Sequence, residues 1–410
     1  MPSSTPLLQG SSIDSSLHGV YTASPIKYMK YGRGSITSLP TLIENLGASK
    51  AYIITGRSLR EKTPVIERIE GILKEKGAWA GTFSGVREHA PIADIHSATS
   101  AIRASGADVL VSVGGGSPID AAKAVAWHLH REAIAGAGAG ADAADIKWVP
   151  SIAVPTTLSA AETTRNAGYT NEKGEKVGVA EGEMVPKAVL YDGDIALHTP
   201  LRLWLSSGIR ALDHALELLY HPSAPEIPTK RLALSALPDL FHLLPASHSC
   251  PDDADIRQRL FLAAYAALFP FQFTGALGLS HAIGHAIGAS YGIPHGITSC
   301  VSLAGVLRYY ATKNGEQARQ IARAACVIPE IESKGDVVED ALAVAKGVQG
   351  LVKVLGLGSW LVDYNVNPGE EEAIAVRALR DPAHPDIRAV TELVRTMYAP
   401  SSSNDAATRL

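Results

Sequence analysis

Three histidines lie close together in the stretch GLSHAIGHAIGASYGIPHG, at His281, His285 and His295. Imidazole is a frequent metal ligand and a frequent proton donor near neutral pH. Imidazole-rich sites for Fe(II) or Zn(II) usually include a carboxylate and leave one position open for substrate. The stretch therefore predicts an active site, and the identity of the fourth group decides whether that site holds a metal.

A second motif suits a phosphate group. VSVGGGSPIDAAKAVA (Val111–Ala126) reads as a strand, a glycine turn and a helix. The glycines let the backbone approach a phosphate closely, the helix N-terminus favours an anion, and Ser117 is expected to cap the helix. We expect Lys123, further along, to be a solvated surface residue. The spacing is neither the Rossmann fingerprint nor a Walker A loop, so the motif alone does not identify the nucleotide.

The N-terminal half alternates strands with helices. Short apolar runs at Lys50–Gly56, Asp108–Gly116 and Trp148–Thr157 are separated by helical patterns such as Val65–Lys76. This alternation predicts a mostly parallel sheet. The third run leads into PTTLSAAETT (Pro155–Thr164), whose hydroxyl groups could bind a nucleotide but are also common in ordinary turns.

Beyond about Ile195 the strand signals fade and helical periodicity takes over. We therefore predict an α/β dinucleotide-binding domain with a parallel sheet over residues 24–195 and an all-α substrate domain over 196–399. Ser-rich flexible tails are expected at 1–23 and 400–410. The helices expected in the second domain are Leu201–Tyr220, Thr229–Leu244, Ile256–Phe269, Glu316–Ala325, Val337–Leu355 and Glu370–Leu379.

Composition excludes several classes of protein. The chain has 410 residues, of which 46% are hydrophobic and 19% charged, and no uninterrupted apolar run is long enough for a membrane span. A formal net charge of −4 without a Lys/Arg-rich run argues against nucleic-acid binding. Three cysteines favour a reduced compartment. We expect a cytoplasmic homodimer that acts on a small molecule.

Four segments together carry a family resemblance. GGGSPIDAAKA, PTTLSAAE, SGIRALDHALE and GLSHAIGHAIGASYGIPHG occur in this order, within a similarity that runs from about Tyr31 to Ala399. The chain resembles the iron-containing (group III) alcohol dehydrogenase family, and within it the maleylacetate reductases. The resemblance implies the two-domain fold described above and NAD(P)-dependent interconversion of carbonyl and alcohol groups.

The resemblance also implies the cofactor site. Gly115, Gly116 and Ser117 would hold the pyrophosphate, the hydroxyl loop would border the adenine side, and Lys176 would lie near the ribose or the nicotinamide. The full expected set is Gly56, Arg57, Ser58, Gly114, Gly115, Gly116, Ser117, Asp120, Thr156, Thr157, Leu158 and Lys176.

The residue after the first strand bears on the choice between NAD(H) and NADP(H). The family often has an acidic residue there, which binds the adenosine ribose and repels a 2′-phosphate. In this chain that position matches Gly56, followed by Arg57 and Ser58. Loss of the carboxylate beside a guanidinium and a hydroxyl suits NADP(H), although Arg57 could equally point into solvent.

The metal ligands of the family are carried over only in part. The three ligand histidines match His214, His281 and His295, and His285 matches a residue proposed to act near the reacting carbon. The ligand aspartate matches Arg210, which is always charged and cannot bind a metal. Maleylacetate reductases also lack this aspartate and are regarded as metal-independent. We therefore expect no divalent metal.

The neighbouring carboxylates offer two alternatives on the same helix. Asp213 cannot replace the missing ligand, because adjacent helix residues such as Asp213 and His214 face different directions, but it could form an i, i+3 salt bridge with Arg210. Glu217 is a possible replacement metal ligand. If a metal is present, it would be held by the three histidines.

The reaction expected is NAD(P)H-dependent reduction of a small carbonyl or unsaturated oxo acid. Arg210 would stabilise an oxyanion or bind a substrate carboxylate, and His285 would donate the proton. His214, His281 and His295 would shape the pocket. Alternatives are a metal-dependent alcohol dehydrogenase with a rebuilt ligand set, a non-redox lyase or cyclase on the same fold, and a cofactor-binding protein without catalysis.

Overall fold

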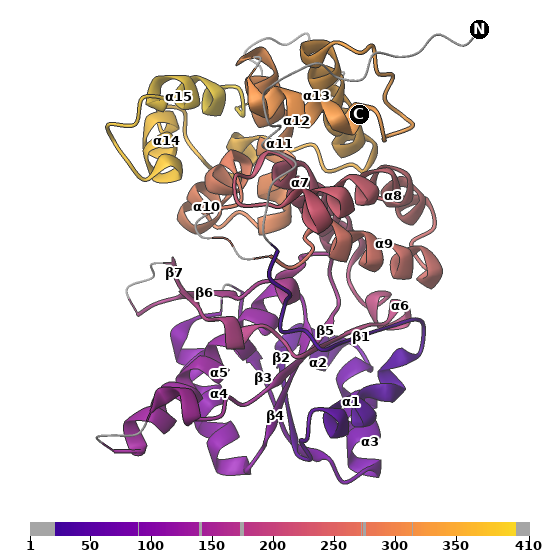
Figure 1. Ribbon diagram of the computed structural model, residues 1–410, viewed down its shortest axis with the longest axis vertical. Coiled ribbons are helices and arrows are strands. Elements are labelled where there is room, and N and C mark those ends of the chain that lie inside the picture. Colours follow the sequence, from indigo (N-terminus) through magenta and orange to yellow (C-terminus); the bar gives the residue numbers. More distant parts are fainter. Residues whose placement is uncertain are drawn as a thin grey trace, which may run out of the picture.

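The computed structural model describes residues 21–398, with the exception of 89, 139–141, 173–175, 272, 274–275 and 314. Two domains are stacked along the long axis of the molecule, an α/β domain and an all-helical domain (Figure 1). The predicted fold class is confirmed. The predicted flexible tails fall outside the described residues, except for Tyr21–Ala23.

A six-stranded parallel sheet forms the centre of the α/β domain, with the strand order β1-β8-β5-β4-β2-β3. Its inner strands are apolar and buried on both faces, as a parallel sheet covered by helices requires. The strands are β1 (Tyr28–Tyr31), β2 (Ala51–Gly56), β3 (Trp79–Val86), β4 (Val109–Gly114), β5 (Ser151–Pro155) and β8 (Ala188–Tyr191).

Helices cover the two faces of this sheet. α1 (Leu39–Asn45) and α3 (Val65–Glu75) bury their apolar residues on one face. α4 (Ile92–Ser105) and α5 (Gly116–Gly136) do so on the other. The short helix α2 (Arg57–Lys62) follows β2 directly.

Five strands of the α/β domain were not predicted. The sequence predicted β2, β4 and β5, but β1, β3 and β8 were not expected. β1 is exposed along its whole length and β3 is only half-buried, so neither carries a buried apolar run. An antiparallel hairpin of β6 (Asn166–Thr170) and β7 (Lys176–Ala180) was also missed; it projects from the side of the domain (Figure 1).

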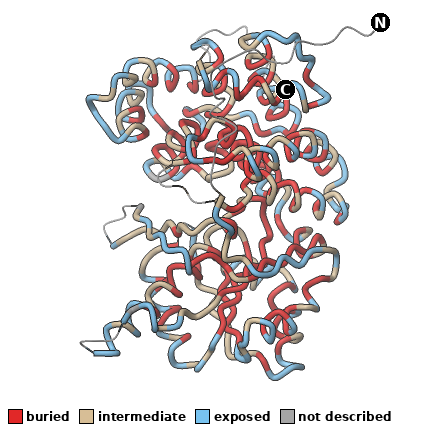
Figure 2. Tube along the Cα trace, viewed as in Figure 1, coloured by how far each residue is buried: buried red, intermediate tan, exposed pale blue. Residues whose placement is uncertain are grey.

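The helical domain is built around α7 (Leu201–Tyr220), which is buried from Trp204 to Leu219 (Figure 2). Apolar residues surround it on all sides, as expected of a helix in the middle of a large core. The helices that follow are α8 (Arg231–Ser249), α9 (Ala254–Ala267), α10 (Leu279–Tyr291), α11 (His295–Lys313), α12 (Glu316–Ala325), α13 (Val337–Val354), α14 (Glu371–Leu379) and α15 (Ile387–Arg395).

The predicted bounds of α7 and α12 agree with the structure residue for residue, and the other predicted helices shift by a few positions. Within the described part of the chain, no helix combines the length and the apolar character needed to cross a membrane.

Candidate functional site

The glycine turn and the hydroxyl loop lie against each other. β4 ends at Gly114, whose φ of +142° favours glycine, and a Cβ added there would lie 2.8 Å from Pro118 Cγ. A Cβ on Gly115 would lie 3.1 Å from Thr157 Cγ2. The two motifs predicted to bind the cofactor are therefore brought together at the carboxyl end of the sheet, where ligands of such folds bind.

The predicted cap of α5 is wrong. α5 begins at Gly116 and its N-cap residue is Gly115, so Ser117 lies inside the first turn. A glycine N-cap leaves the first backbone N–H groups without a side-chain acceptor from the cap residue. This arrangement suits an anion at the helix N-terminus.

Lys123 is fully buried, so the prediction of a solvated lysine is wrong. Its Nζ donates to the carbonyl oxygens of Ala161 at 2.6 Å and Asn166 at 2.8 Å, and to Thr164 Oγ1 at 3.2 Å. Burial lowers the pKa of Lys123. The chain between the hydroxyl loop and β6 packs over α5, and Lys123 fixes it in place.

Asp120 continues this connection. One of its carboxylate oxygens lies 3.3 Å from Lys123 Nζ, and the other accepts from the Gly168 N–H at 3.3 Å. The helix that carries the phosphate turn is thus tied to the β6–β7 hairpin.

The hydroxyl loop is also fixed to the helical domain. The Thr156 carbonyl accepts from Thr199 Oγ1 at 2.6 Å, and the Leu158 N–H donates to Ser207 Oγ at 3.0 Å. The Leu158 side chain is buried in the core of the helical domain. Because Ser207 lies on α7, the loop joins the predicted cofactor site to the helix that carries Arg210.

The remaining predicted cofactor residues are placed as follows. Gly56 ends β2 at the same carboxyl edge, and a Cβ on it would lie 3.3 Å from the Val86 carbonyl oxygen. Arg57 begins α2, and its largely exposed side chain has its Nε 3.8 Å from Glu61 Oε1. Lys176 begins β7, where it pairs with Thr170.

The four candidate histidines form two pairs. His214 on α7 and His281 on α10 are buried, with ring centroids 4.8 Å apart. His285 on α10 and His295 at the start of α11 are half-buried, with ring centroids 5.9 Å apart. The structure therefore brings together the histidines that the sequence predicted, at the meeting point of three helices.

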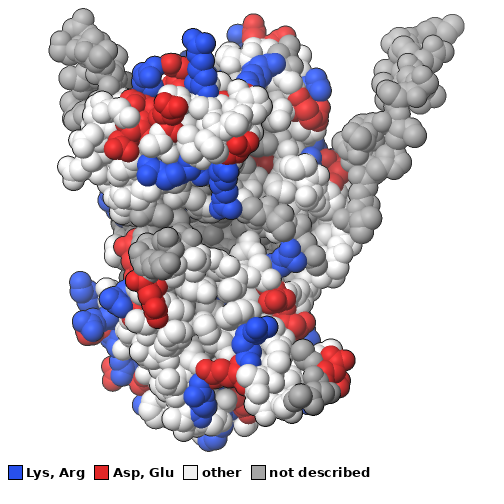
Figure 3. Space-filling model, turned by 90° about the vertical axis from the view of Figure 1, so that its left-hand side faces the viewer, with Lys and Arg blue, Asp and Glu red and all other residues white. Residues whose placement is uncertain are grey.

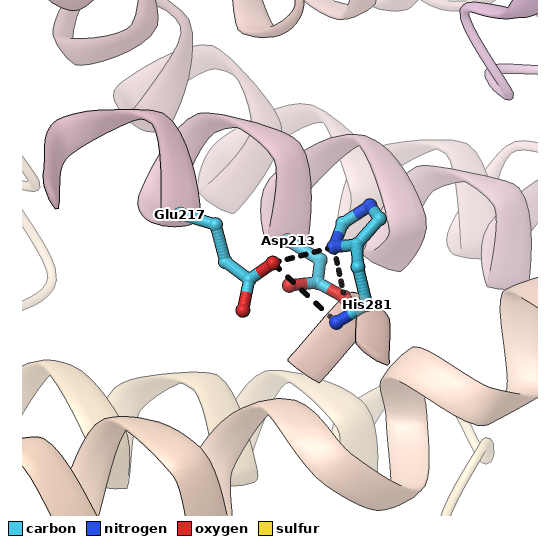
Figure 4. Close-up of side chains that lie close together, drawn as sticks. All are labelled: Asp213, Glu217 and His281. Carbon is cyan, nitrogen blue, oxygen red and sulfur yellow. Dashed lines mark hydrogen bonds and ion pairs between the residues drawn. The ribbon is translucent and has the colours of Figure 1, made fainter. Parts of the chain in front are cut away.

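Two carboxylates hold His281 from the side of α7 (Figure 4). Glu217 Oε2 lies 2.7 Å and Asp213 Oδ2 lies 3.4 Å from His281 Nδ1. Both carboxylates are completely buried. The sequence indicated a possible role for each acid separately, but not that both carboxylates contact the imidazole of His281.

Arg210 is buried beside this cluster. Its Nη1 donates to Ser299 Oγ at 3.1 Å and lies 3.8 Å from Asp213 Oδ2, which confirms the predicted i, i+3 contact. Ser299 Oγ in turn donates to Asp213 at 2.6 Å. A Cβ on Gly284 of α10 would lie 2.8 Å from Thr298 Oγ1 and 3.4 Å from Arg210 Nη1, so α10 packs closely against α11 beside the guanidinium.

Burial and the charges of this cluster shift the pKa values of its members. Burial lowers the pKa of Arg210 and holds the pKa of His214 well below its usual range. Burial and Arg210 oppose protonation of His281, but Asp213 and Glu217 outweigh them and raise its pKa. Burial and Asp213 raise the pKa of Glu217. The cluster therefore opposes protonation of His214 and favours protonation of His281.

Three side chains of this cluster are of the types that bind a divalent metal. Asp213, Glu217 and His281 place ligand atoms within 4.8 Å of one another. However, His281 Nδ1 already lies at hydrogen-bond distance from Glu217, and Asp213 Oδ2 accepts from Ser280 and Ser299, which leaves Asp213 Oδ1 as the carboxylate oxygen without a hydrogen bond. Arg210 occupies the position that matches the ligand aspartate. A fixed cation so close opposes a dication, so the residues do not fit the ligand set of the family.

Two nitrogen atoms remain available for a ligand. His281 Nε2 and His214 Nδ1 are buried and make no hydrogen bond. Buried polar atoms are usually paired, and unpaired ones at an active site often face a reactant. Viewed from the side on which the β6–β7 hairpin projects, the molecule is hollowed where the two domains meet, and acidic and basic side chains are intermixed around it (Figure 3).

Comparison with known proteins agrees with this geometry. Residues 27–193 match the model of iron-containing alcohol dehydrogenases, and residues 204–398 match the C-terminal model of that family. Lactaldehyde reductase of Escherichia coli (strain K12) is 30% identical over 380 residues, which cover 90% of this chain and 97% of the relative. Maleylacetate reductase of Rhizobium sp. (strain MTP-10005) is 31% identical over 261 residues, which cover 64% of this chain and 66% of the relative.

The crystal structure of maleylacetate reductase from Rhizobium sp. strain MTP-10005 superimposes with a TM-score of 0.75 at 25% identity, and the match covers 93% of this chain and 98% of that one. The resemblance inferred from the four motifs is thus confirmed. The chain belongs to the iron-containing alcohol dehydrogenase family and is an NAD(P)-dependent oxidoreductase.

Proposed function

We propose that the enzyme reduces a small oxo acid with NADPH and that it does so without a metal ion. The observation that carries this proposal is the buried Arg210, which is hydrogen-bonded to Ser299 and paired with Asp213. By the resemblance of the sequence, Arg210 stands at the position of the family's ligand aspartate. A guanidinium can neutralise a developing oxyanion or bind a carboxylate in the place of a metal.

The residues of the chain divide the remaining work. When bound, the cofactor supplies the hydride. Arg210 stabilises negative charge on the substrate, and His285 donates the proton to the new hydroxyl group. His281, whose Nδ1 is held by Glu217 and Asp213, presents Nε2 toward the reactants beside the neutral His214. His295 lines the other side of the pocket next to His285.

The preference for NADPH rests on the end of β2. Gly56 carries no carboxylate to repel a 2′-phosphate, and the exposed Arg57 follows it on α2. Arg57 and Glu61 lie 3.8 Å apart and largely exposed, so this pair is weak and the guanidinium can turn to a phosphate.

A second candidate function is a metal-dependent alcohol dehydrogenase with an altered ligand set. It is favoured by the grouping of Asp213, Glu217 and His281 within 4.8 Å. Arg210 argues against it, since its Nη1 lies 3.8 Å from Asp213 Oδ2 and its charge would repel an ion bound by this carboxylate. The two non-redox alternatives are not supported, because the family consists of oxidoreductases.

The substrate proposal is tested by comparing 2-oxo acids with aldehydes of equal chain length, with NADPH and with NADH. We expect kcat/KM to be about tenfold or more higher for the oxo acids, a difference of about 1.4 kcal/mol in transition-state stabilisation. Equal values for the two substrate types would refute binding of a substrate carboxylate.

We also propose that the protein is a cytoplasmic homodimer. Its cysteines are free thiols. β1 is an edge strand with exposed Tyr28, Met29 and Tyr31, a surface on which a second copy could pair. Light scattering should give twice the mass of the chain, and Met29→Pro should shift it to the monomer; a monomeric wild type would refute the proposal.

A further inference from the structure

A second pocket lies between the two domains, apart from the histidine site. It is a concavity of about 340 Å³ that is partly open to solvent. From the α/β domain it is lined by the segment Thr22–Pro25 before β1, by Thr163 and Arg165 before β6, and by Val185 before β8. From the helical domain, Pro270 and Phe271 line it. It shares no lining residue with the cluster of Arg210 and the four histidines.

Arg165 is the unusual residue of this pocket. Its Nε is buried and has no hydrogen-bond partner. Among the Lys and Arg side chains of the described residues, no other nitrogen is both buried and without a partner. Other partly buried arginines are paired: Arg60 with Glu70 at 2.7 Å, and Arg323 with Glu226. A buried N–H donor of a charged group that finds no acceptor in the protein points to an acceptor supplied from outside.

The other walls of the pocket define what accompanies that acceptor. Val185 is buried, and Phe271 stacks on Phe273 with ring centroids 4.9 Å apart. His221 packs against Phe271 at a centroid distance of 5.5 Å, and burial lowers its pKa, so the ring is neutral. The pocket thus combines a single unpaired cation with an apolar wall.

We propose that this pocket binds a short-chain organic carboxylate, with the carboxylate on Arg165 and the aliphatic part against Val185 and Phe271. A guanidinium pairs with a carboxylate through two parallel N–H donors, which would satisfy Nε and one terminal nitrogen together.

The position of the pocket between the domains predicts that a bound ligand stabilises their arrangement. Because the walls come from both domains, a bound carboxylate contacts both at once. A ligand that binds only this arrangement stabilises it by an amount that grows with the ratio of the ligand concentration to its Kd. The ligand should therefore raise the melting temperature of the whole protein, whatever substrate the enzyme reduces.

The test uses the full-length protein, saturated with NADPH, and sodium butyrate as the probe. Calorimetry and thermal melts compare butyrate with butyramide, which has the same shape without the charge. We expect butyrate to bind and to raise the melting temperature, and butyramide to do neither. Arg165→Met should weaken butyrate binding by about tenfold or more, the scale of one charge-assisted pair.

Arg259→Met is the matched control. Arg259 is an exposed arginine on α9, and its replacement should leave butyrate binding unchanged. Equal affinity of Arg165→Met and wild type for butyrate would overturn the proposal. So would equal binding of butyrate and butyramide to the wild type, a comparison that does not depend on the folding of any variant. A butyrate affinity that falls in Arg210→Met but not in Arg165→Met would place the butyrate in the proposed substrate site and would overturn the proposal, whereas failure of the enzyme to reduce oxo acids would refute only the proposed reaction.

Discussion

Replacement of Arg210 by methionine tests the structure of the site most fully. Methionine keeps much of the side-chain volume but removes the cation. The change breaks the hydrogen bond to Ser299 at 3.1 Å and the contact of Nη1 with Asp213 Oδ2 at 3.8 Å. At an effective dielectric constant of about 20, unit charges at this distance attract by about 4 kcal/mol. Breaking a buried pair typically costs about 3–5 kcal/mol, because the remaining charge is left unpaired.

Two measurements follow from this magnitude. In urea unfolding, Arg210→Met should lose about 3–5 kcal/mol of stability. The double variant Arg210→Met/Asp213→Asn should lose clearly less than the sum of the two single changes, because neither charge is left alone. In the oxo-acid assay, kcat should fall about 100- to 1000-fold, the usual effect of removing one oxyanion-stabilising donor.

Arg259→Met is again the control, since this exposed arginine contacts neither site. A folded Arg210→Met protein with nearly unchanged kcat would refute the catalytic role. Additive stability changes in the double variant would show that Arg210 and Asp213 do not form an energetically significant pair.

Three other substitutions test the cofactor side. Gly56→Asp should reduce kcat/KM for NADPH about tenfold relative to Gly56→Ala, because a carboxylate there repels the 2′-phosphate; equal values in the two variants would show that the ribose does not lie at Gly56. Gly115→Val should weaken NADPH binding in calorimetry about tenfold, or about 1.4 kcal/mol, since its Cβ would lie 3.1 Å from Thr157 Cγ2. The control Gly136→Ala, at the far end of α5, should leave NADPH binding unchanged. Unchanged affinity in Gly115→Val would show that the cofactor does not bind at this turn. Lys123→Met should flatten the dependence of stability on pH. Burial lowers the folded-state pKa of this lysine below its ordinary value of 10.5, so stability in the wild type rises with pH between the two values; an equally steep rise in the variant would contradict this.

Local pattern was sufficient for some parts of the molecule. α7 and α12 could be predicted to the residue because each carries an uninterrupted helical pattern. The contact between Arg210 and Asp213 was also predictable, since residues three apart on a helix lie on neighbouring faces. β2, β4 and β5 were found because each is a buried apolar run, whereas β8, which is equally buried but only four residues long, was missed.

Contacts between distant segments were not predictable in this way. Lys123 looked like a surface lysine, and it is buried by the segment around Asn166, which lies more than forty positions further on. The hydrogen bond between Glu217 and His281 joins residues 64 positions apart. Both contacts depend on how the elements pack, and neither residue carries a local signal of its partner. β1 was missed for a related reason, since it is held by β8 and buries none of its own residues.

The central claim is that Arg210 replaces the metal of this family. Its most direct test is elemental analysis of protein prepared without chelators, combined with the oxo-acid assay before and after prolonged treatment with EDTA. We predict far less than one equivalent of iron or zinc and full activity after EDTA, because the buried cation opposes a dication beside Asp213 and His281. Stoichiometric metal in the wild type, with activity lost to the chelator and restored by one ion, would contradict the claim and would make Asp213, Glu217 and His281 the ligands to examine first.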